Sequence, residues 1–319
     1  MKNNKITNLR ALAIILVVLG HSIIIYKSGW NYYTTSQDCQ LFNYVCMFIY
    51  LFHMPLFFSI SGYLFIDSCT KKKFSTILKN KFKRLIIPYL IIGILWVYPI
   101  RIISNYSGFV GHSFLYNIII NIILGLDNGH LWFLSSLFLM FIISYFLEKY
   151  VKNRKIKFIL ILSMFLLGHI LNLSWISETL KFIIWFYFGN FIRKYSLENK
   201  MKYRKIVAVA TIFFICMYFI TYNLSAYISL LFKYCVCLTI IPLLYNIISN
   251  RKFTLLQKIS DYSFGVYLFH SPMIYFTFCF LHNISPMLML LINFFCFGFV
   301  AYFISKQLSN SKLKFIIGG

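Results

Sequence analysis

Acidic residues are the scarcest charged class in this sequence, with only seven Asp and Glu among 319 residues. All charged residues together make up 12% of the chain, whereas hydrophobic residues make up 60%. A soluble globule of this length needs roughly a quarter of its residues charged to cover its surface. The composition therefore excludes a soluble protein and favours a chain embedded in a membrane.

Motifs for metal, redox and nucleotide chemistry are also missing. The sequence contains no Cys-x-x-Cys pair, no His-Glu-x-x-His, no glycine-rich phosphate loop and no Gly-x-Ser-x-Gly. Six of the eight cysteines lie inside apolar runs, where they serve as small packing residues. We therefore expect no metal site and no bound cofactor.

Basic residues are abundant by contrast: 31 Lys and Arg give a net charge of +24. On a soluble chain this excess would indicate nucleic-acid binding. Here the basic residues gather in short segments between apolar runs, where cytoplasmic retention of Lys and Arg sets membrane topology. We expect membrane lipid, and no nucleic acid, as a partner.

Eleven apolar runs follow one another along the chain, and all but the fourth are long enough for a membrane that needs roughly 17–25 residues. The runs cover residues 8–27, 42–66, 85–104, 115–126, 131–148, 157–173, 179–193, 205–222, 226–248, 262–282 and 286–305.

The distribution of charge indicates whether the fourth run crosses the membrane. If 115–126 does not cross, 27 of the 31 basic residues lie on one side of the membrane. If it does cross, 17 of these 27 move to the other side. We therefore predict an all-α integral membrane protein with about ten transmembrane helices and one re-entrant or interfacial segment near 113–126. It is expected in the bacterial inner membrane with both termini cytoplasmic. The basic residues left over for the outer side or the spans are Lys27, Arg101, Lys181 and Lys233, the last of which is expected to snorkel outward.

No repeat, low-complexity tract or linker divides the chain. We expect a single membrane-embedded domain over 1–319 with a short cytoplasmic tail, 306–319.

Ionisable groups within the spans are the first candidates for function, because each is costly in a membrane. Arg10 and His21 are eleven residues apart, close to three helical turns, so they share one face of the first helix about 16 Å apart. Arg10 as an inner charge flank and His21 as an interhelical hydrogen-bonding group are the simpler alternatives.

Two further spans carry a histidine beside a proline, His53 with Pro55 and His270 with Pro272. Each proline leaves the carbonyl four residues earlier without its helical donor, so the helix can bend there. These histidines either serve a site or are satisfied locally. The carbonyls that these prolines free are those of Leu51 and Leu268.

Gly62 provides a small surface at which another helix can approach closely.

Two loops offer polar groups at opposite ends of the spans. Lys81, Lys83 and Arg84 precede the third span, either as a topology signal or as a site for a phosphorylated ligand. His130 and Trp132 begin the run at 131–148, where they either anchor the helix at the interface or bind a sugar. A buried neutral histidine suits a general base that removes a proton from a hydroxyl.

Taken together these motifs resemble the acyltransferase 3 family of multispanning bacterial O-acyltransferases that modify surface polysaccharides. The resemblance covers most of the chain, in the expected order. It is carried by Arg10 through His21, by Phe52-His53-Met54-Pro55 through Gly62, by Lys83-Arg84 through Pro88-Tyr89, by His130-Leu131-Trp132-Phe133-Leu134, and by Tyr262 through His270.

The resemblance implies that His21 is catalytic, as base or acyl carrier, with Arg10 in support, and that Arg84, Lys81 and Lys83 bind the donor. His53, His130, Trp132 and His270 are secondary candidates. The implied donor is acetyl-CoA or another short acyl-CoA from the cytosol, as a co-substrate. The implied acceptor is a hydroxyl of a surface glycan or lipid-linked saccharide. Some relatives carry an extracytoplasmic hydrolase-like domain, which we do not expect here. A transporter or exporter of an acylated glycan is the alternative function.

Overall fold

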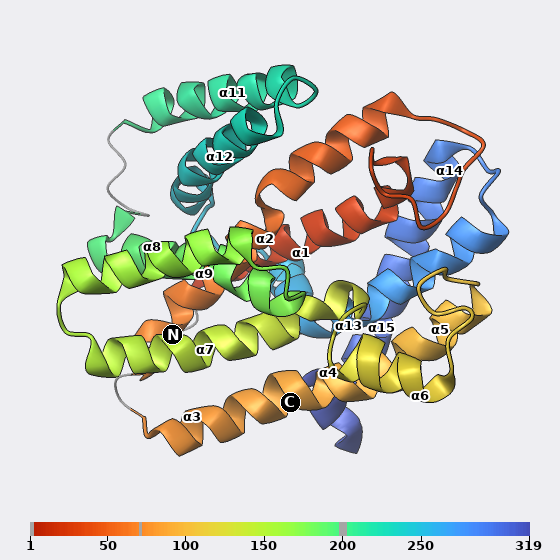
Figure 1. Ribbon diagram of the computed structural model, residues 1–319, viewed down its shortest axis with the longest axis horizontal. Helices are drawn as coiled ribbons and strands as arrows, with labels where there is room; N and C mark the ends of the chain where they lie inside the picture. The colour runs from red at the N-terminus through yellow and green to blue at the C-terminus, as the bar shows by residue number, and fades with distance from the viewer. Residues whose placement is uncertain (1–2, 70–71, 198–202) are drawn as a thin grey trace.

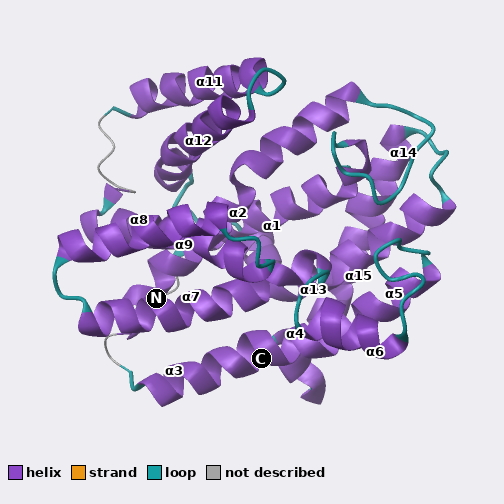
Figure 2. Ribbon diagram, viewed as in Figure 1, coloured by secondary structure: helices purple, strands orange, loops and turns teal. Residues whose placement is uncertain are grey.

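The computed structural model describes residues 3–69, 72–197 and 203–319, and within them every regular element is a helix (Figure 2). The first half contains α1 (Asn4–Ser22), η1 (Ile24–Tyr26), α2 (Gln40–Cys69), α3 (Phe74–Lys81), η2 (Phe82–Ile86), α4 (Ile87–Ile92), η3 (Gly93–Val97), α5 (Tyr98–Ile103), α6 (Phe114–Tyr116), η4 (Asn117–Ile123) and η5 (Gly129–Leu131). The second half contains α7 (Trp132–Tyr150), α8 (Arg154–Ile170), α9 (Trp175–Tyr195), α11 (Arg204–Thr221), α12 (Ala226–Ile247), α13 (Thr254–Phe280), α14 (Pro286–Leu290), η6 (Leu291–Phe297), α15 (Gly298–Ser309) and η7 (Lys312–Ile317).

Seven helical stretches in the described residues are long and apolar enough to cross a membrane: Asn4–Ser22, Gln40–Phe65, Phe74–Ile103, Gly129–Tyr150, Arg204–Thr221, Ala226–Ile247 and Pro286–Ser309. Helices also form at three other predicted spans, as α8, α9 and α13. These three helices are not among the seven membrane-spanning candidates. α8 has only 17 residues, and α9 and α13 carry more polar and charged residues.

The segment near 113–126 forms a short apolar helix, Phe114–Ile123. Ten residues rise only about 15 Å, half of a membrane core. Two asparagines on this helix bind the loop before it: Asn117 donates to the Phe109 carbonyl (3.0 Å) and Asn121 to the Gly108 carbonyl (3.1 Å). The helix therefore folds back beside the chain that leads into it.

The helices pack into a bundle in which α2 lies against α9 and α1 against α13, while α11 and α12 form a hairpin at one corner (Figure 1). Gly62 and Gly189 explain how closely α2 and α9 approach. A Cβ at Gly62 would lie 1.8 Å from the carbonyl oxygen of Phe186, and one at Gly189 would lie 1.8 Å from that of Ser59. The predicted close approach at Gly62 is confirmed.

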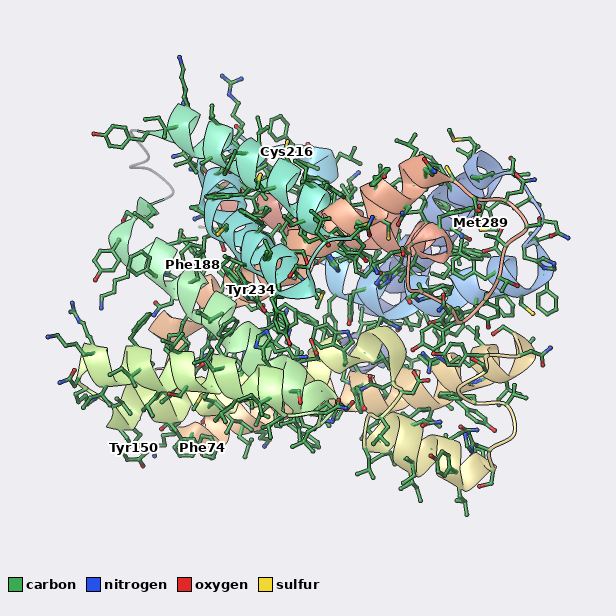
Figure 3. The ribbon with its side chains drawn as sticks, turned by 45° about the horizontal axis from the view of Figure 1, so that its top comes forward. Phe74, Tyr150, Phe188, Cys216, Tyr234 and Met289 are labelled. Carbon is green, nitrogen blue, oxygen red and sulfur yellow. The ribbon has the colours of Figure 1, made fainter. Side chains whose placement is uncertain are left out.

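Aromatic side chains fill the spaces between the ribbons (Figure 3). Where α3 begins and α7 ends, the Phe74 ring lies 5.0 Å from that of Phe146, which stacks on Tyr150 at 6.0 Å. Rings bury a large area in few residues, so they suit a bundle whose surroundings are themselves apolar.

Pro55 in α2 and Pro272 in α13, the two prolines beside a histidine, each lie within a helix that continues past the proline. The carbonyls that they free find donors on other elements. Cys237 Sγ donates to the Leu51 carbonyl at 3.2 Å, and His130 Nε2 lies 3.1 Å from the Leu268 carbonyl. The two freed carbonyls therefore connect α2 to α12 and α13 to η5.

Candidate active site

Predicted site residues line two cavities in the described part of the bundle. One, here the histidine cavity, has a volume of about 510 Å³ and is lined by His21, His53, His130 and Trp132 among others. The second, here the basic cavity, has a volume of about 310 Å³ and is lined by Arg10, Lys81 and Arg84 among mostly apolar residues. The structure thus separates the predicted residues into two groups, with Arg10 and His21 of α1 in different cavities.

His21 is hydrogen-bonded to His270, with 2.9 Å between Nδ1 of His21 and Nε2 of His270. The two rings are stacked, with centroids 5.0 Å apart. His270 is buried, and its Nδ1 lies 2.8 Å from the carbonyl oxygen of Val266.

This arrangement fixes the tautomers of two neutral imidazoles. A carbonyl can only accept, so His270 carries its proton on Nδ1 and donates to Val266. His270 Nε2 is then an acceptor, and His21 must donate to it from Nδ1. The remaining nitrogen of His21, Nε2, is left with a lone pair, as a general base requires.

His53 does not contact His21, although the sequence allowed them to approach. Its Nδ1 lies 2.8 Å from the Ile49 carbonyl, a local bond within α2. Tyr50 stands between the two histidines, with its ring 4.7 Å from His53 and 6.2 Å from His21. The Tyr50 hydroxyl is buried, lines the histidine cavity and has no hydrogen-bond partner in the described chain.

His130 and Trp132 line the histidine cavity as well, but both also make structural contacts. His130 donates from Nε2 to the freed Leu268 carbonyl, which places its Nδ1 as an acceptor. Trp132 packs against Phe58 and Phe182, with ring centroids 6.1 and 5.6 Å away.

Arg101 is a cavity residue that the sequence left without a role. Its side chain is 1% exposed and donates to the Asp127 carbonyl (2.7 Å) and carboxylate (3.0 Å). Its guanidinium also lies 4.1 Å from the Tyr106 ring centroid. Burial raises the pKa of Tyr106, which keeps this phenol neutral. Arg101 therefore fixes the loop that carries Asp127 at the cavity wall.

The basic cavity brings together three of the four predicted cations at the start of the third span and in α1. Lys81 lies over the Phe141 ring at 3.6 Å, a cation–π contact. Arg84 is exposed at the rim, where Gly318 of the C-terminal tail packs on it. Lys83 is exposed and does not line this cavity. Its role in donor binding stays a prediction from the resemblance.

Tyr267 of α13 lines both cavities, and within the described residues no other side chain does so. Its hydroxyl donates to the carbonyl oxygen of His130, and its ring meets Phe133 edge-on at 5.5 Å. Tyr267 therefore forms part of the wall between the histidine cavity and the basic cavity.

The expectation that Lys233 snorkels outward is wrong, because Lys233 lines the histidine cavity. It lies one helical turn before Cys237, which bonds to α2, so both point to the same inner face of α12. Sequence reasoning also missed Tyr50, Arg101, Lys181 and Tyr267. The available signal was the topology count: of the four basic residues left over, Arg101, Lys181 and Lys233 line this cavity.

Comparison with known proteins identifies the family of this chain. Residues 3–306 match the family described as an acyltransferase domain, the acyltransferase 3 family. The chain is also 35% identical over 83 residues to the nodulation protein NolL of Sinorhizobium fredii (strain NBRC 101917 / NGR234), a match covering 25% of this chain and 20% of that protein. The chain thus aligns with about a fifth of that relative. No solved structure matches significantly.

The described residues form an all-helical bundle with several apolar helices, and the family match covers nearly the whole chain. The chain belongs to the acyltransferase 3 family, and its described residues include several helices long and apolar enough to cross a membrane.

Proposed function

We propose that this protein transfers an acetyl or other short acyl group from acyl-CoA to a hydroxyl of a surface or lipid-linked glycan. The observation that carries the proposal is the hydrogen-bonded series from His21 through His270 to the Val266 carbonyl, beside a cavity large enough for a saccharide. Volumes of about 300–1,000 Å³ are usual for small-molecule sites.

The acceptor hydroxyl would bind in the histidine cavity with its proton directed at Nε2 of His21. As the oxygen attacks the thioester carbonyl, a C–O bond forms, the C–S bond breaks, and the proton passes to Nε2. The CoA thiolate leaves and then takes this proton, which restores the neutral histidine. His270 contributes as a positioning residue, because its Nε2 accepts from His21 and stabilises the imidazolium that forms.

The donor would bind in the basic cavity. CoA carries phosphates at one end and a thin, mostly apolar arm at the other. Arg10, Lys81 and Arg84 supply positive charge, while residues such as Phe57, Leu137 and Phe264 supply apolar walls. For the thioester to reach His21, the arm must pass the wall formed by Tyr267.

The proposed setting is the bacterial inner membrane, with ten crossings, an interfacial helix near 113–126 and both termini in the cytoplasm. Contacts between loops support this topology. The Lys5 amide donates to the Asn250 side chain (3.2 Å), and the tail packs on Arg84, so predicted inner segments lie together. Thr35 bonds to the His282 carbonyl (2.9 Å), which joins two predicted outer loops.

The test is transfer of label from radiolabelled acetyl-CoA to glycan in inside-out membrane vesicles. Wild-type vesicles should leave alkali-labile label on glycan, His21→Ala should lower the rate about 10²–10⁴-fold, and His112→Ala, an exposed histidine outside both cavities, should match the wild type. Wild-type transfer by His21→Ala vesicles would contradict the proposal. A transporter would move glycan without leaving label on it.

A further inference from the structure

The histidine cavity is lined by charged side chains as well as by its histidines. Three cations line it, Arg101 from α5, Lys181 from α9 and Lys233 from α12, together with two carboxylates, Asp127 and Glu178. Charged groups at this depth are costly unless they are paired or serve a ligand.

Two of the three cations are paired with the carboxylates. Arg101 pairs with Asp127 at 3.0 Å, and Lys181 pairs with Glu178 at 2.7 Å. Lys233 makes neither a hydrogen bond nor an ion pair to any residue in 3–69, 72–197 or 203–319. The cavity is therefore left with one positive charge that the protein does not neutralise.

The position of Lys233 is set by packing and not by access to water. Cys237, one turn later in α12, is held against α2 by its bond to the Leu51 carbonyl. Lys233 consequently lines the same cavity as His53. The nearby carboxylate, Glu178, is already bonded to Lys181. With Glu178 bonded to Lys181, a ligand anion is the partner that this cavity leaves open for the Lys233 ammonium.

The rest of the cavity wall suits a sugar. Trp30, Tyr32, Trp132 and Trp175 line it, and flat rings of this kind stack on sugar faces while polar groups bind hydroxyls. The Tyr50 hydroxyl supplies one such group without a protein partner. The aromatic walls and the one unpaired lysine together favour a saccharide that bears a negative charge.

We propose that the acceptor is an anionic saccharide, bearing a carboxylate or a phosphate group that binds Lys233. The proposal rests on the proposed function, since it names the class of acceptor for the histidine cavity. It places the anion beside α12 and leaves the hydroxyl to be acylated facing His21.

Binding without donor tests this proposal separately from transfer. Purified protein is titrated with glucuronate, glucose 6-phosphate, inorganic phosphate and glucose at constant ionic strength, followed by the fluorescence of the tryptophans in the cavity wall. At least one anionic probe should bind about 10-fold or more tightly than glucose. Glucuronate and glucose 6-phosphate distinguish a carboxylate from a phosphate ligand.

Three variants test whether Lys233 causes the preference for anionic probes over glucose. Lys233→Met should abolish the preference for the anionic probe, and Lys233→Arg should retain most of it. The matched control, Lys252→Met, removes an exposed lysine that does not line the cavity, so it should bind as the wild type does.

Equal binding of glucose and every anionic probe to the wild type, or a preference that survives in Lys233→Met, would overturn the proposal. A preference that depends on Lys233 in a protein that transfers no acyl group would instead uphold the anion site and reject the proposed function. The two failures are therefore distinguishable.

Discussion

The histidine cavity and the basic cavity differ in how firmly their polar groups are held. In the histidine cavity His21, His53, His130 and Arg101 each have a hydrogen-bond partner that fixes the ring or guanidinium. In the basic cavity neither Arg10 nor Arg84 hydrogen-bonds to a side chain in the described residues, and Lys81 rests on an aromatic ring. A fixed group suits a chemical step, whereas a flexible cation suits binding of a mobile phosphate.

Breaking the hydrogen bond between His21 and His270 should lower the rate more than any change in the basic cavity. His270→Ala should lower kcat about 10²-fold with little change in KM for acyl-CoA, because His21 loses the acceptor that orients it. His270→Gln keeps an acceptor near the same position and should recover most of the rate. Steady-state kinetics with radiolabelled acetyl-CoA measure both. Equal losses in the two variants would indicate a purely structural role.

In the basic cavity the same measurement should give the opposite pattern. Arg10→Gln with Arg84→Gln should raise KM for acyl-CoA about 10-fold and leave kcat within a factor of about three, because these side chains supply charge to the donor and not to the reacting atoms. Added salt should weaken donor binding less in this double variant than in the wild type. A fall in kcat alone would contradict the division into two cavities.

Variants of Tyr267 test the wall between the histidine cavity and the basic cavity. Tyr267→Ala should widen the passage and raise the butyryl-to-acetyl ratio of kcat/KM about fivefold, because a smaller side chain leaves room for added methylene groups. Tyr267→Phe keeps the ring and should leave that ratio unchanged. Transfer from acetyl-CoA and butyryl-CoA in the same vesicles gives the ratio, and an unchanged ratio in Tyr267→Ala would remove Tyr267 from the passage.

The smallest expected effect is on the KM for acyl-CoA, and it distinguishes Lys83 from Lys81. Lys83→Gln should change KM for acyl-CoA by no more than about twofold, because an exposed charge outside the cavity is screened by solvent. Lys81→Gln, at a residue that lines the cavity, should change it more. Parallel KM measurements compare the two variants. An equal increase in both would restore Lys83 to the donor site.

Much of the fold could be predicted because it depends on local features. Hydropathy and charge placed the apolar helices, and the short run at 115–126 became a ten-residue helix. The prolines at 55 and 272 identified the two carbonyls that need donors from elsewhere, since a proline always lacks its N–H. Gly62 predicted close packing because only glycine leaves room for a neighbouring backbone.

The site was predicted only in part. The sequence indicated His21 and His270 separately and offered His53 as the neighbour of His21, because α1 and α2 are consecutive. The structure instead pairs His21 with His270, 249 residues away, since α1 packs along α13. Lys233 was expected to snorkel outward. Its true orientation could not be predicted, because hydropathy does not show which way a nearly uniform apolar helix is turned.

By itself the sequence determined that this chain is a membrane-embedded bundle of helices and which backbone groups its prolines would leave unpaired, because both follow from the chemistry of a few neighbouring residues. The tertiary structure alone decided which histidine fixes the tautomer of His21, that Arg10 and His21 serve different cavities, and that Lys233 points inward. The rotation of each helix about its axis is set by packing against segments distant in sequence, and that rotation determines which side chains meet.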